Sequence, residues 1–300
     1  MRAWKFAAAL VAVAAVAASL TVGGTASATP AACPNLYVVA IPGTWETSSG
    51  ATARPGMLTG VTAGLPGNVR SDYVSYTATA FPWEGEAYGR SKNEAVANAR
   101  GMVAAMAQQC GNTRFGLLGY SQGADAAGDL AAEIGSGLGV IPPTRLAAVG
   151  LISDPRRSPT DALVGPPVVG SGAAGTHLGG FGLVTPQVRS ICAVGDLYCA
   201  TAKDDFVLRF AGFLAQSSDP NPAKFGQYQQ EAALLYNDLM ISGGMPTLQS
   251  QLSDQANKDR AMQLAKFYGS QVHTDYANYP VDGVGNSAIS WMHNWFRGIA

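Results

Sequence analysis

Charged residues are scarce in this chain: Asp, Glu, Lys and Arg together make up only 13% of its 300 residues. A coiled coil needs far more charge, so that class of structure is excluded. The charges nearly cancel, with 19 basic and 20 acidic side chains, and no basic stripe is present, so nucleic acid is not an expected partner. Hydrophobic residues reach 47%, enough for a sizeable core, which excludes a mostly disordered chain.

Long apolar runs are lacking except near the N-terminus. Arg2 and Lys5 precede an apolar run over residues 7–22, and the small residues Ala-Ser-Ala follow at 26–28. This order predicts a secretory signal peptide over residues 1–28, cleaved near Ala28, and hence a secreted or cell-envelope protein. The alternative is an uncleaved membrane anchor, for which the run is at the short end of the required length.

Cysteine is also rare, with four residues: Cys33, Cys110, Cys192 and Cys199. An even number in an exported chain predicts two disulfides. Of the three connectivities, Cys192-Cys199 closes a short, sterically easy loop and leaves Cys33-Cys110 as the second bridge. Zinc is disfavoured because the spacings do not match the usual ligand pairs. A lipid-modified Cys33 is disfavoured because Pro30 stands where an aliphatic residue belongs.

The pattern of apolar residues in the remaining chain predicts alternating strands and helices, and therefore one α/β domain over residues 29–300. Strands separated by helices imply a mostly parallel central sheet with helices on both faces. The Gly- and Pro-rich segment 155–185 predicts a long surface loop. The expected strands are 36–41, 69–79, 114–118, 146–152 and 188–193, and the expected helices among them are 91–109 and 124–134.

The pentapeptide Gly119-Tyr120-Ser121-Gln122-Gly123 fits the G-x-S-x-G pattern of a nucleophilic serine. In a chain with 36 glycines the pattern alone is weak, but here it follows an apolar strand and opens an Ala-rich helix. A sharp turn between this strand and this helix would hold the serine hydroxyl above the sheet edge, beside the positive end of the helix dipole. The alternative is a glycine-rich turn with a helix-capping serine.

A serine nucleophile needs a base, and the chain has only three histidines: His177, His273 and His293. His177 lies in the Gly-rich segment, and His293 lies between tryptophans in a predicted terminal helix, where packing is the more ordinary role. The chain order of hydrolases, serine then acid then histidine, favours a late histidine on a loop. His273 is therefore the preferred base.

The preferred acid is Asp196, inside the segment Cys192–Cys199. A carboxylate that orients an imidazole must be held rigidly, and a small disulfide loop directly after a strand provides that rigidity. The alternative is a solvated turn aspartate.

Two other aspartates are rivals for this role. Asp154 also ends a strand, but Arg156 and Arg157 follow it, which predicts a structural salt bridge. Asp275 is too close in sequence to His273 to be the first choice.

Together, Ser121 within Gly-Tyr-Ser-Gln-Gly-Ala, the Cys-flanked Asp196 and Cys33 just before the first strand resemble the cutinase family of serine esterases. The resemblance covers most of residues 33–199 and resumes near His273, and it implies an α/β-hydrolase fold. The stretch Ile-Pro-Gly-Thr-Trp-Glu at 41–46 resembles actinobacterial, mycobacterial-type members of the cell envelope, with phospholipase and thioesterase activity.

The resemblance also implies an oxyanion hole. One donor would be the backbone N–H of Gln122, and the other would come from Thr44, through its backbone N–H and its hydroxyl. Fixed donors at the developing oxyanion are worth about 2.7–4 kcal/mol each. Without the resemblance, the sequence would indicate only an ordinary turn residue at Thr44.

The sequence departs from the compact family pattern between the acid and the base. Residues 204–268 contain amphipathic stretches at 205–216, 225–240 and 248–268, which predict two or three inserted helices. We expect a cap or lid that shields a long acyl chain from water. The alternative is additional packing against the sheet.

These features predict a secreted serine esterase that hydrolyses acyl esters or thioesters of lipids through an acyl-enzyme. The expected partners are the lipid or acyl-ester substrate and peripheral membrane or envelope lipids. No metal or nucleotide cofactor is indicated, and a monomer is expected. The alternatives are an acyltransferase with the same triad and a catalytically silent lipid-binding envelope protein.

Overall fold

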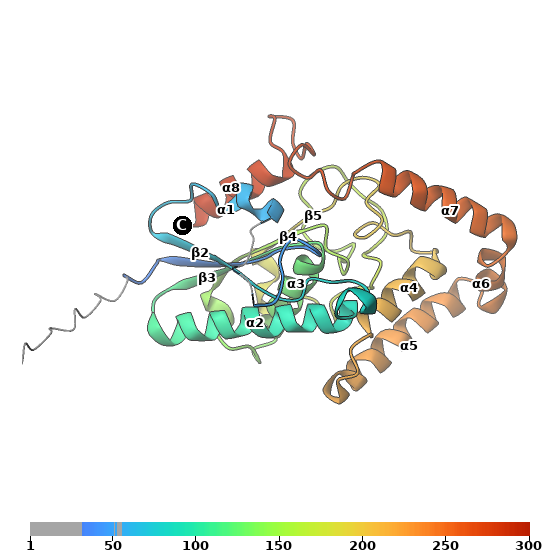
Figure 1. Cartoon of the computed structure of the whole chain (residues 1–300), viewed down its shortest axis with the longest axis horizontal. Helices are drawn as coiled ribbons and strands as arrows, with labels where there is room; N and C mark the ends of the chain where they lie inside the picture. The colour runs from blue at the N-terminus through green and yellow to red at the C-terminus, as the bar shows by residue number, and fades with distance from the viewer. Residues whose placement is uncertain (1–31, 51, 53–55) are drawn as a thin grey trace, which may run out of the picture. The chain divides into compact units, whose positions relative to one another are not determined.

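The structure, a computed structural model, describes residues 32–50, 52 and 56–300. Five parallel strands form a sheet in the order β2-β1-β3-β4-β5 (Figure 1). They are β1 (Leu36–Ile41), β2 (Val69–Tyr73), β3 (Arg114–Tyr120), β4 (Leu146–Ile152) and β5 (Val188–Ile191). The inner strands β1, β3 and β4 are almost fully buried, because apolar side chains on both faces of the sheet are covered.

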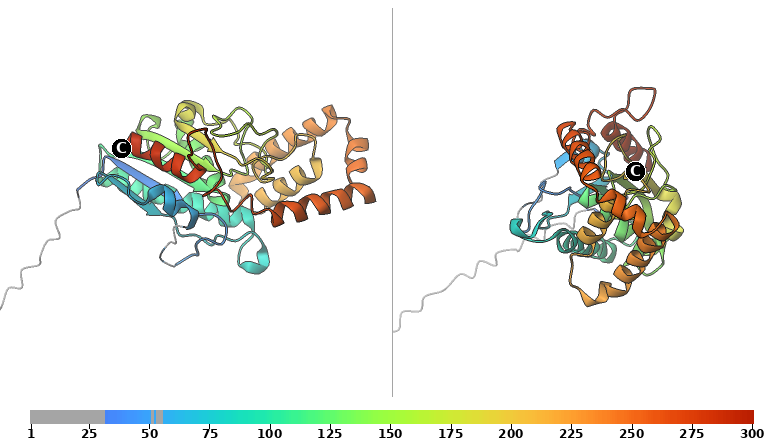
Figure 2. Two further views of the ribbon diagram at one scale, coloured as in Figure 1. Left: turned by 90° about the horizontal axis from the view of Figure 1, so that it is seen from above. Right: turned by 90° about the vertical axis from the view of Figure 1, so that its right-hand side faces the viewer.

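Helices cover both faces of the sheet (Figures 1 and 2). On one face, alternate strand residues share an apolar cluster with α2 (Tyr88–Gln109) and α3 (Gln122–Gly135). On the other face, the intervening strand residues share a second cluster with α1 (Thr59–Thr62) and α8 (Ala288–Ile299). The predicted α/β architecture, with a parallel sheet between two helical layers, is confirmed.

Of the α-helices that follow the last strand, four lie together in Figure 2: α4 (Phe206–Gln216), α5 (Phe225–Ile241), α6 (Met245–Gln251) and α7 (Asp254–Gly269). Helices α4, α5 and α6 share an apolar cluster of their own, with Phe206, Leu235 and Leu239 at its centre. The sequence predicts two or three helices in this segment, whereas the structure has four, because the amphipathic stretch 248–268 is divided between α6 and α7. Ser253 ends one helix and caps the next, its side chain accepting the Ala256 N–H.

Two other segments differ from expectation. The second strand ends at Tyr73, and beyond it side-chain hydrogen bonds replace the ladder, such as the one from the Tyr76 hydroxyl to the Pro42 carbonyl. The segment 155–185 is not a surface loop throughout, since Arg156 and His177 are buried in it. Short 3₁₀ helices occur at Gly56–Leu58, Pro82–Glu84, Pro143–Arg145, Gly182–Gln187 and Pro222–Lys224.

Two disulfides are present, Cys33–Cys110 and Cys192–Cys199, with Cα–Cα distances of 5.6 and 5.9 Å. The first joins the chain before β1 to the end of α2, and the second closes the loop after β5. The predicted signal peptide, residues 1–28, lies outside the described residues. Within the described part of the chain, no helix combines the length and the apolar character needed to cross a bilayer.

Candidate active site

The candidate catalytic residues gather at one edge of the sheet. Thr44 follows β1, Ser121 follows β3, and Asp196 follows β5. Because the strands are parallel, their carboxyl ends share this edge, which is where ligands bind in open α/β sheets. Residues from separate parts of the chain therefore converge without any special loop path.

Ser121 lies on the sharp turn between β3 and α3. Its backbone is strained, with φ 55° and ψ −122°, which lifts the hydroxyl above the sheet edge. Two glycines make the turn feasible. A Cβ at Gly119 would overlap the backbone of Gly123 and Ala124, and a Cβ at Gly123 would overlap the Ile41 carbonyl. These positions require glycine because the helix approaches the strand too closely for any side chain.

His273 lies between the serine and the acid. Its Nε2 is 2.9 Å from the Ser121 Oγ, and its Nδ1 is 3.0 Å from the Asp196 Oδ2. The Tyr120 hydroxyl donates to the His273 carbonyl at 2.6 Å, and the Tyr198 ring lies 4.6 Å from the imidazole between centroids. Contacts on the backbone and on the ring thus fix the imidazole in the geometry of a general base.

Asp196 is fully buried, and its surroundings favour the ionised form. Burial alone would raise the pKa of Asp196, but hydrogen bonding and charge from His273, together with hydroxyl donors from Ser153 and Tyr276, bring that pKa below its ordinary value. The carboxylate can therefore stabilise an imidazolium on His273 without taking its proton.

The predicted oxyanion donors lie beside the serine. The Gln122 N–H belongs to the first turn of α3, where backbone donors have no intrahelical partner. The Thr44 hydroxyl lies 3.4 Å from the Gln122 Oε1, and both Thr44 and Ser121 line the same cavity. Glu46 shapes the turn that carries Thr44, because its carboxylate accepts the Gly43 N–H at 2.8 Å.

The other candidate residues lie apart from this group. Asp154 bonds the Nε2 of His177 and the Arg156 backbone N–H, so the expected salt bridge to the arginine side chains is wrong: its charged partner is a histidine. His293 contacts the Val61 carbonyl through Nδ1. Asp275 accepts a hydrogen bond from a neighbouring asparagine in its own turn.

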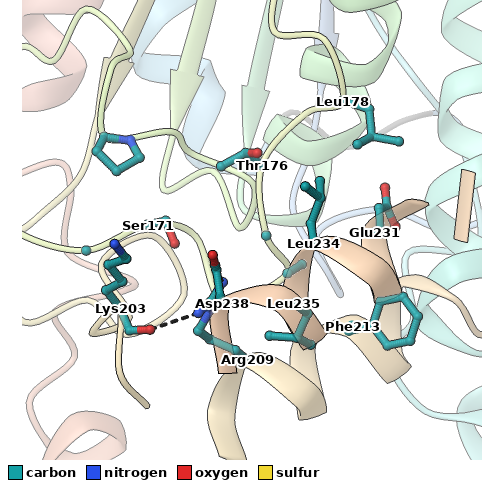
Figure 3. Close-up of a pocket in the computed structure, with 14 residues that line it drawn as sticks. Ser171, Thr176, Leu178, Lys203, Arg209, Phe213, Glu231, Leu234, Leu235 and Asp238 are labelled. Atoms are coloured by element: carbon teal, nitrogen blue, oxygen red, sulfur yellow. Dashed lines mark hydrogen bonds and ion pairs between the residues drawn. The ribbon is translucent and has the colours of Figure 1, made fainter. Parts of the chain in front are cut away.

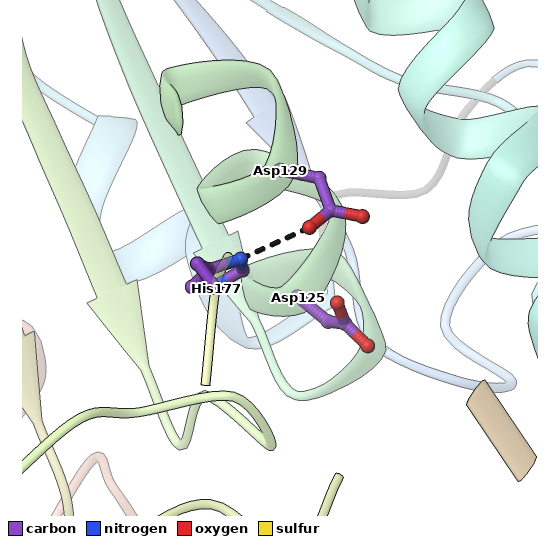
Figure 4. A group of neighbouring side chains, drawn as sticks. All are labelled: Asp125, Asp129 and His177. Atoms are coloured by element: carbon purple, nitrogen blue, oxygen red, sulfur yellow. Dashed lines mark hydrogen bonds and ion pairs between the residues drawn. The ribbon is translucent and has the colours of Figure 1, made fainter. Parts of the chain in front are cut away.

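His177 belongs to a buried ionic cluster with Asp125 and Asp129 (Figure 4). Both ring nitrogens face carboxylates, Asp129 at 3.0 Å and Asp154 at 3.1 Å. Burial would lower the pKa of His177, but the charge of Asp154 and the hydrogen bonds that the ring donates to the Asp129 and Asp154 carboxylates raise it to about 9. The ring is therefore a cation.

Two further cations complete this cluster. Lys92 lies 2.5 Å from the Asp129 carboxylate, and Arg156 bridges Asp129 to Glu231 of α5. The carboxylates are thus already neutralised by side chains of the protein. We assign the cluster a structural role, joining α2, α3 and α5, rather than metal binding.

A cavity of about 750 Å³ opens beside Ser121, which is within the usual range for small-molecule sites. Helices α4 and α7 contribute to its lining, together with the loops after β1, β2, β4 and β5. The apolar lining residues include Trp45, Phe81, Leu208, Ala211, Ala215, Leu264 and Phe267. The inserted helices therefore line the space next to the nucleophile.

A second cavity of about 370 Å³ lies between α4, α5 and the segment 159–178 (Figure 3). Phe213 and Leu234 line it, together with the ion pair of Arg209 and Asp238. Ala174 lines both cavities, whereas none of Ser121, His273 and Asp196 lines the smaller one. Helix α4 thus presents small residues toward the nucleophile and larger ones toward the second cavity.

Sequence reasoning missed two residues at the site, Ser153 and Tyr276. Both hydroxyls donate to the Asp196 carboxylate, at 2.6 and 2.7 Å. Ser153 carried a usable signal, because it is a polar residue directly after the parallel strand β4. Tyr276 carried none beyond its nearness to His273.

A family model described as cutinase matches residues 32–211. The chain belongs to the cutinase family. The matched segment includes β1 to β5 with Ser121 and Asp196, and it ends within α4, so most of the inserted helices and His273 lie beyond it. The expected family is confirmed, whereas the narrower envelope subgroup stays a prediction.

Known proteins show the same similarity. A carboxylesterase Culp6 homolog from Corynebacterium glutamicum is 33% identical over 202 residues, which cover 56% of this chain and 65% of the relative. The chain thus spans just under two thirds of that relative's length. Among solved structures, the acetyl xylan esterase core domain from Trichoderma reesei has 22% identity and a TM-score of 0.46, covering 69% of this chain and 100% of that one. Lysin B from Mycobacteriophage D29 has 19% identity and a TM-score of 0.46, covering 71% and 92%.

Proposed function

We propose that this protein is a serine hydrolase of acyl esters and thioesters of lipids. The observation that carries the proposal is the hydrogen-bonded series from the Ser121 Oγ through His273 to Asp196, at the mouth of an apolar cavity. A serine hydroxyl bonded to a histidine that a buried carboxylate orients is the arrangement of nucleophilic acyl transfer.

In the first step, the Ser121 Oγ attacks the ester carbonyl carbon while the His273 Nε2 accepts the hydroxyl proton. The new C–O bond pushes the carbonyl π electrons onto oxygen, where the Gln122 N–H and Thr44 donate to the oxyanion. Asp196 stabilises the imidazolium and holds its tautomer. Collapse of the tetrahedral intermediate expels the alcohol or thiol, which takes the proton from His273 and leaves an acyl-Ser121 ester.

In the second step, water replaces the departed alcohol. His273 removes a proton from the water as its oxygen attacks the acyl carbon, and the same donors hold the second oxyanion. Collapse then breaks the bond to the Ser121 Oγ, which recovers its proton from His273. The products are the free acid and the resting enzyme.

The cavity supports a long acyl group as the substrate. Its lining is dominated by apolar side chains, and α4 and α7 contribute much of it. Of these two helices, α4 packs with α5 and α6 around an apolar cluster separate from the two clusters that cover the sheet. That separation favours a cap over the acyl chain rather than additional packing on the sheet. Phospholipids and other envelope acyl lipids fit this description.

Exposed aromatic residues at the cavity mouth support peripheral contact with lipid. Trp45 and Trp83 are 68% and 79% exposed, and Phe81 stacks on Trp83 with ring centroids 4.7 Å apart. Aromatic rings of this kind settle at membrane–water interfaces. The two disulfides and the cutinase family indicate an extracellular protein, consistent with export by the predicted signal peptide.

The deciding experiment compares turnover of short-chain and long-chain p-nitrophenyl esters, a phospholipid and an acyl-CoA, together with labelling by a fluorescent alkyl phosphonate. We expect Ser121 to be labelled and long-chain substrates to have the higher kcat/KM. Labelling of Ser121 with no turnover of any ester would instead favour the acyltransferase. Neither labelling nor turnover, with retained lipid binding, would favour the catalytically silent binder.

A further inference from the structure

One oxygen of Asp196 receives an unusual number of donors. Its Oδ2 lies 3.0 Å from the His273 Nδ1, 2.6 Å from the Ser153 hydroxyl and 2.7 Å from the Tyr276 hydroxyl. The other oxygen, Oδ1, accepts the Tyr198 N–H at 3.1 Å. Orienting the imidazole requires only the first of these contacts, so the two hydroxyls need a separate explanation.

Ser153 adopts a backbone conformation that a residue with a Cβ avoids. Its φ is 53°, in the left-handed region, and its side chain is fully buried. The backbone is held there because its N–H donates to the Ile191 carbonyl of β5 at 2.8 Å. Glycine would adopt this conformation at lower cost, so the conformation alone does not require a serine.

The hydroxyl of Ser153 reaches both the candidate base and the carboxylate that orients it. Besides donating to Asp196, its Oγ lies 3.0 Å from the His273 Nδ1, so it can accept a share of that N–H. Tyr276 is anchored independently, because its hydroxyl oxygen accepts the Ala193 N–H at 2.9 Å. Both hydroxyls therefore hold fixed positions around the contact between the carboxylate and the imidazole.

We propose that Ser153 and Tyr276 are positioning residues of the triad, acting on His273 through the Asp196 carboxylate. They fix the carboxylate where it accepts the hydrogen bond from the His273 Nδ1–H, and they lower its basicity so that the proton stays on the imidazole. This inference rests on the proposed hydrolase function. Neither residue lines the 750 Å³ cavity, so neither contacts substrate.

The test compares the variants Ser153→Ala, Ser153→Gly and Tyr276→Phe with the full-length wild-type protein on a p-nitrophenyl ester. A hydrogen bond to a charged group is strong enough for each loss to lower kcat by about 10- to 100-fold. KM should stay unchanged because the cavity is untouched. Ser153→Gly should lose as much as Ser153→Ala, although glycine relieves the backbone strain.

The pH profile separates positioning from mere support of the fold. With fewer donors, the Asp196 carboxylate becomes a stronger base and holds the imidazolium more tightly. The acidic limb of kcat/KM should then move to higher pH, by up to about one pH unit. A matched control is Tyr279→Phe, because the Tyr279 hydroxyl accepts the Val194 N–H of the same loop without touching Asp196. This control should leave both kcat and the acidic limb unchanged.

The outcomes distinguish the two proposals. If the wild-type protein turns over esters while Ser153→Ala and Tyr276→Phe keep its kcat and its acidic limb, the positioning role is wrong and the hydrolase function stands. The positioning role would also be overturned if the variants had a lower kcat but an unchanged acidic limb in the pH profile of kcat/KM. Full activity in Ser153→Gly would overturn it as well. If the wild-type protein neither turns over esters nor reacts with a phosphonate, both proposals fall.

Discussion

The His273 Nδ1 lies 3.0 Å from the Asp196 Oδ2, although 77 residues and four helices separate the two along the chain. The two residues are close because the chain comes back to the sheet edge after the helices α4 to α7. Helix α7 ends at Gly269, and its last turn stays at the site because Tyr268 bonds the Tyr198 hydroxyl at 3.2 Å. The inserted helices thus end where the imidazole is needed, and they line the cavity on the way.

Replacement of the nucleophile is the simplest test of the triad. Ser121→Ala should lower kcat for any ester by about 10⁴- to 10⁶-fold, because the remaining residues cannot form the acyl-enzyme. Turnover of a p-nitrophenyl ester measures the change. Ser136→Ala, at the other end of α3 where the hydroxyl contacts only backbone groups of Glu133 and Leu138 among the described residues, should keep wild-type turnover. Equal activity in the two variants would exclude Ser121 as the nucleophile.

Removal of either disulfide should lower the unfolding free energy, but only removal of Cys192–Cys199 should also lower kcat. By loop length, removing Cys192–Cys199 costs about 2.5 kcal/mol of unfolding free energy, and removing Cys33–Cys110 costs about 4.5 kcal/mol. Only the shorter loop holds Asp196, so Cys192→Ala/Cys199→Ala should lower kcat about tenfold or more. Cys33→Ala/Cys110→Ala should keep kcat, because this bridge lies at the amino ends of β1 and β3.

Urea unfolding and ester turnover, both measured at a temperature where each variant is folded, check this prediction. A larger loss of kcat in the variant lacking Cys33–Cys110 would contradict the assigned role of the short loop.

Chain-length selectivity should depend on the small residues of α4. Ala211 lines the large cavity, so Ala211→Phe should fill part of it and lower kcat/KM for a long-chain ester about tenfold, with little change for a short-chain ester. Leu214→Phe is the matched control, because Leu214 is on the same helix and is 66% exposed. Equal loss on both chain lengths in Ala211→Phe would argue against an acyl-binding cavity.

Alkaline conditions should weaken the buried cluster. The pKa of His177 is raised to about 9 in the folded protein, whereas the unfolded value is about 6.5, so the protonated ring stabilises the fold fully below pH 6.5. That contribution, on the order of 3 kcal/mol, is lost as pH rises from 6.5 through 9. The unfolding free energy of the wild-type protein should fall over this range.

The matched variants are His177→Gln, which should be less stable at pH 6.5 and lack this decline, and His293→Gln, which should retain it. His293 contacts a backbone carbonyl and is outside the cluster. Chemical unfolding at several pH values provides the measurement, and an unchanged decline in His177→Gln would refute the assignment.

Local sequence pattern predicted most of the sheet. The uninterrupted apolar runs at 36–41 and 146–152 correspond to β1 and β4, because strands buried on both faces carry apolar side chains at every position. The pattern failed over 74–79, where buried residues such as Val74 and Tyr76 lie in a loop whose polar groups find side-chain partners. Burial, rather than strand structure, produced the apolar pattern there.

Sequence alone singled out Ser121 as the candidate nucleophile. Gly119 and Gly123 flank Ser121 between a strand and a helix, and the strained turn is encoded within these five residues. Spacing along the chain could not choose between Asp196 and Asp154, because both follow strands that end at the same edge of the sheet. Only the tertiary structure decided that the Asp196 carboxylate is the one that contacts His273. It also placed the Ser153 hydroxyl on the same carboxylate. A hydrogen bond needs atoms within about 3 Å, and contacts between distant segments are set by packing rather than by local sequence.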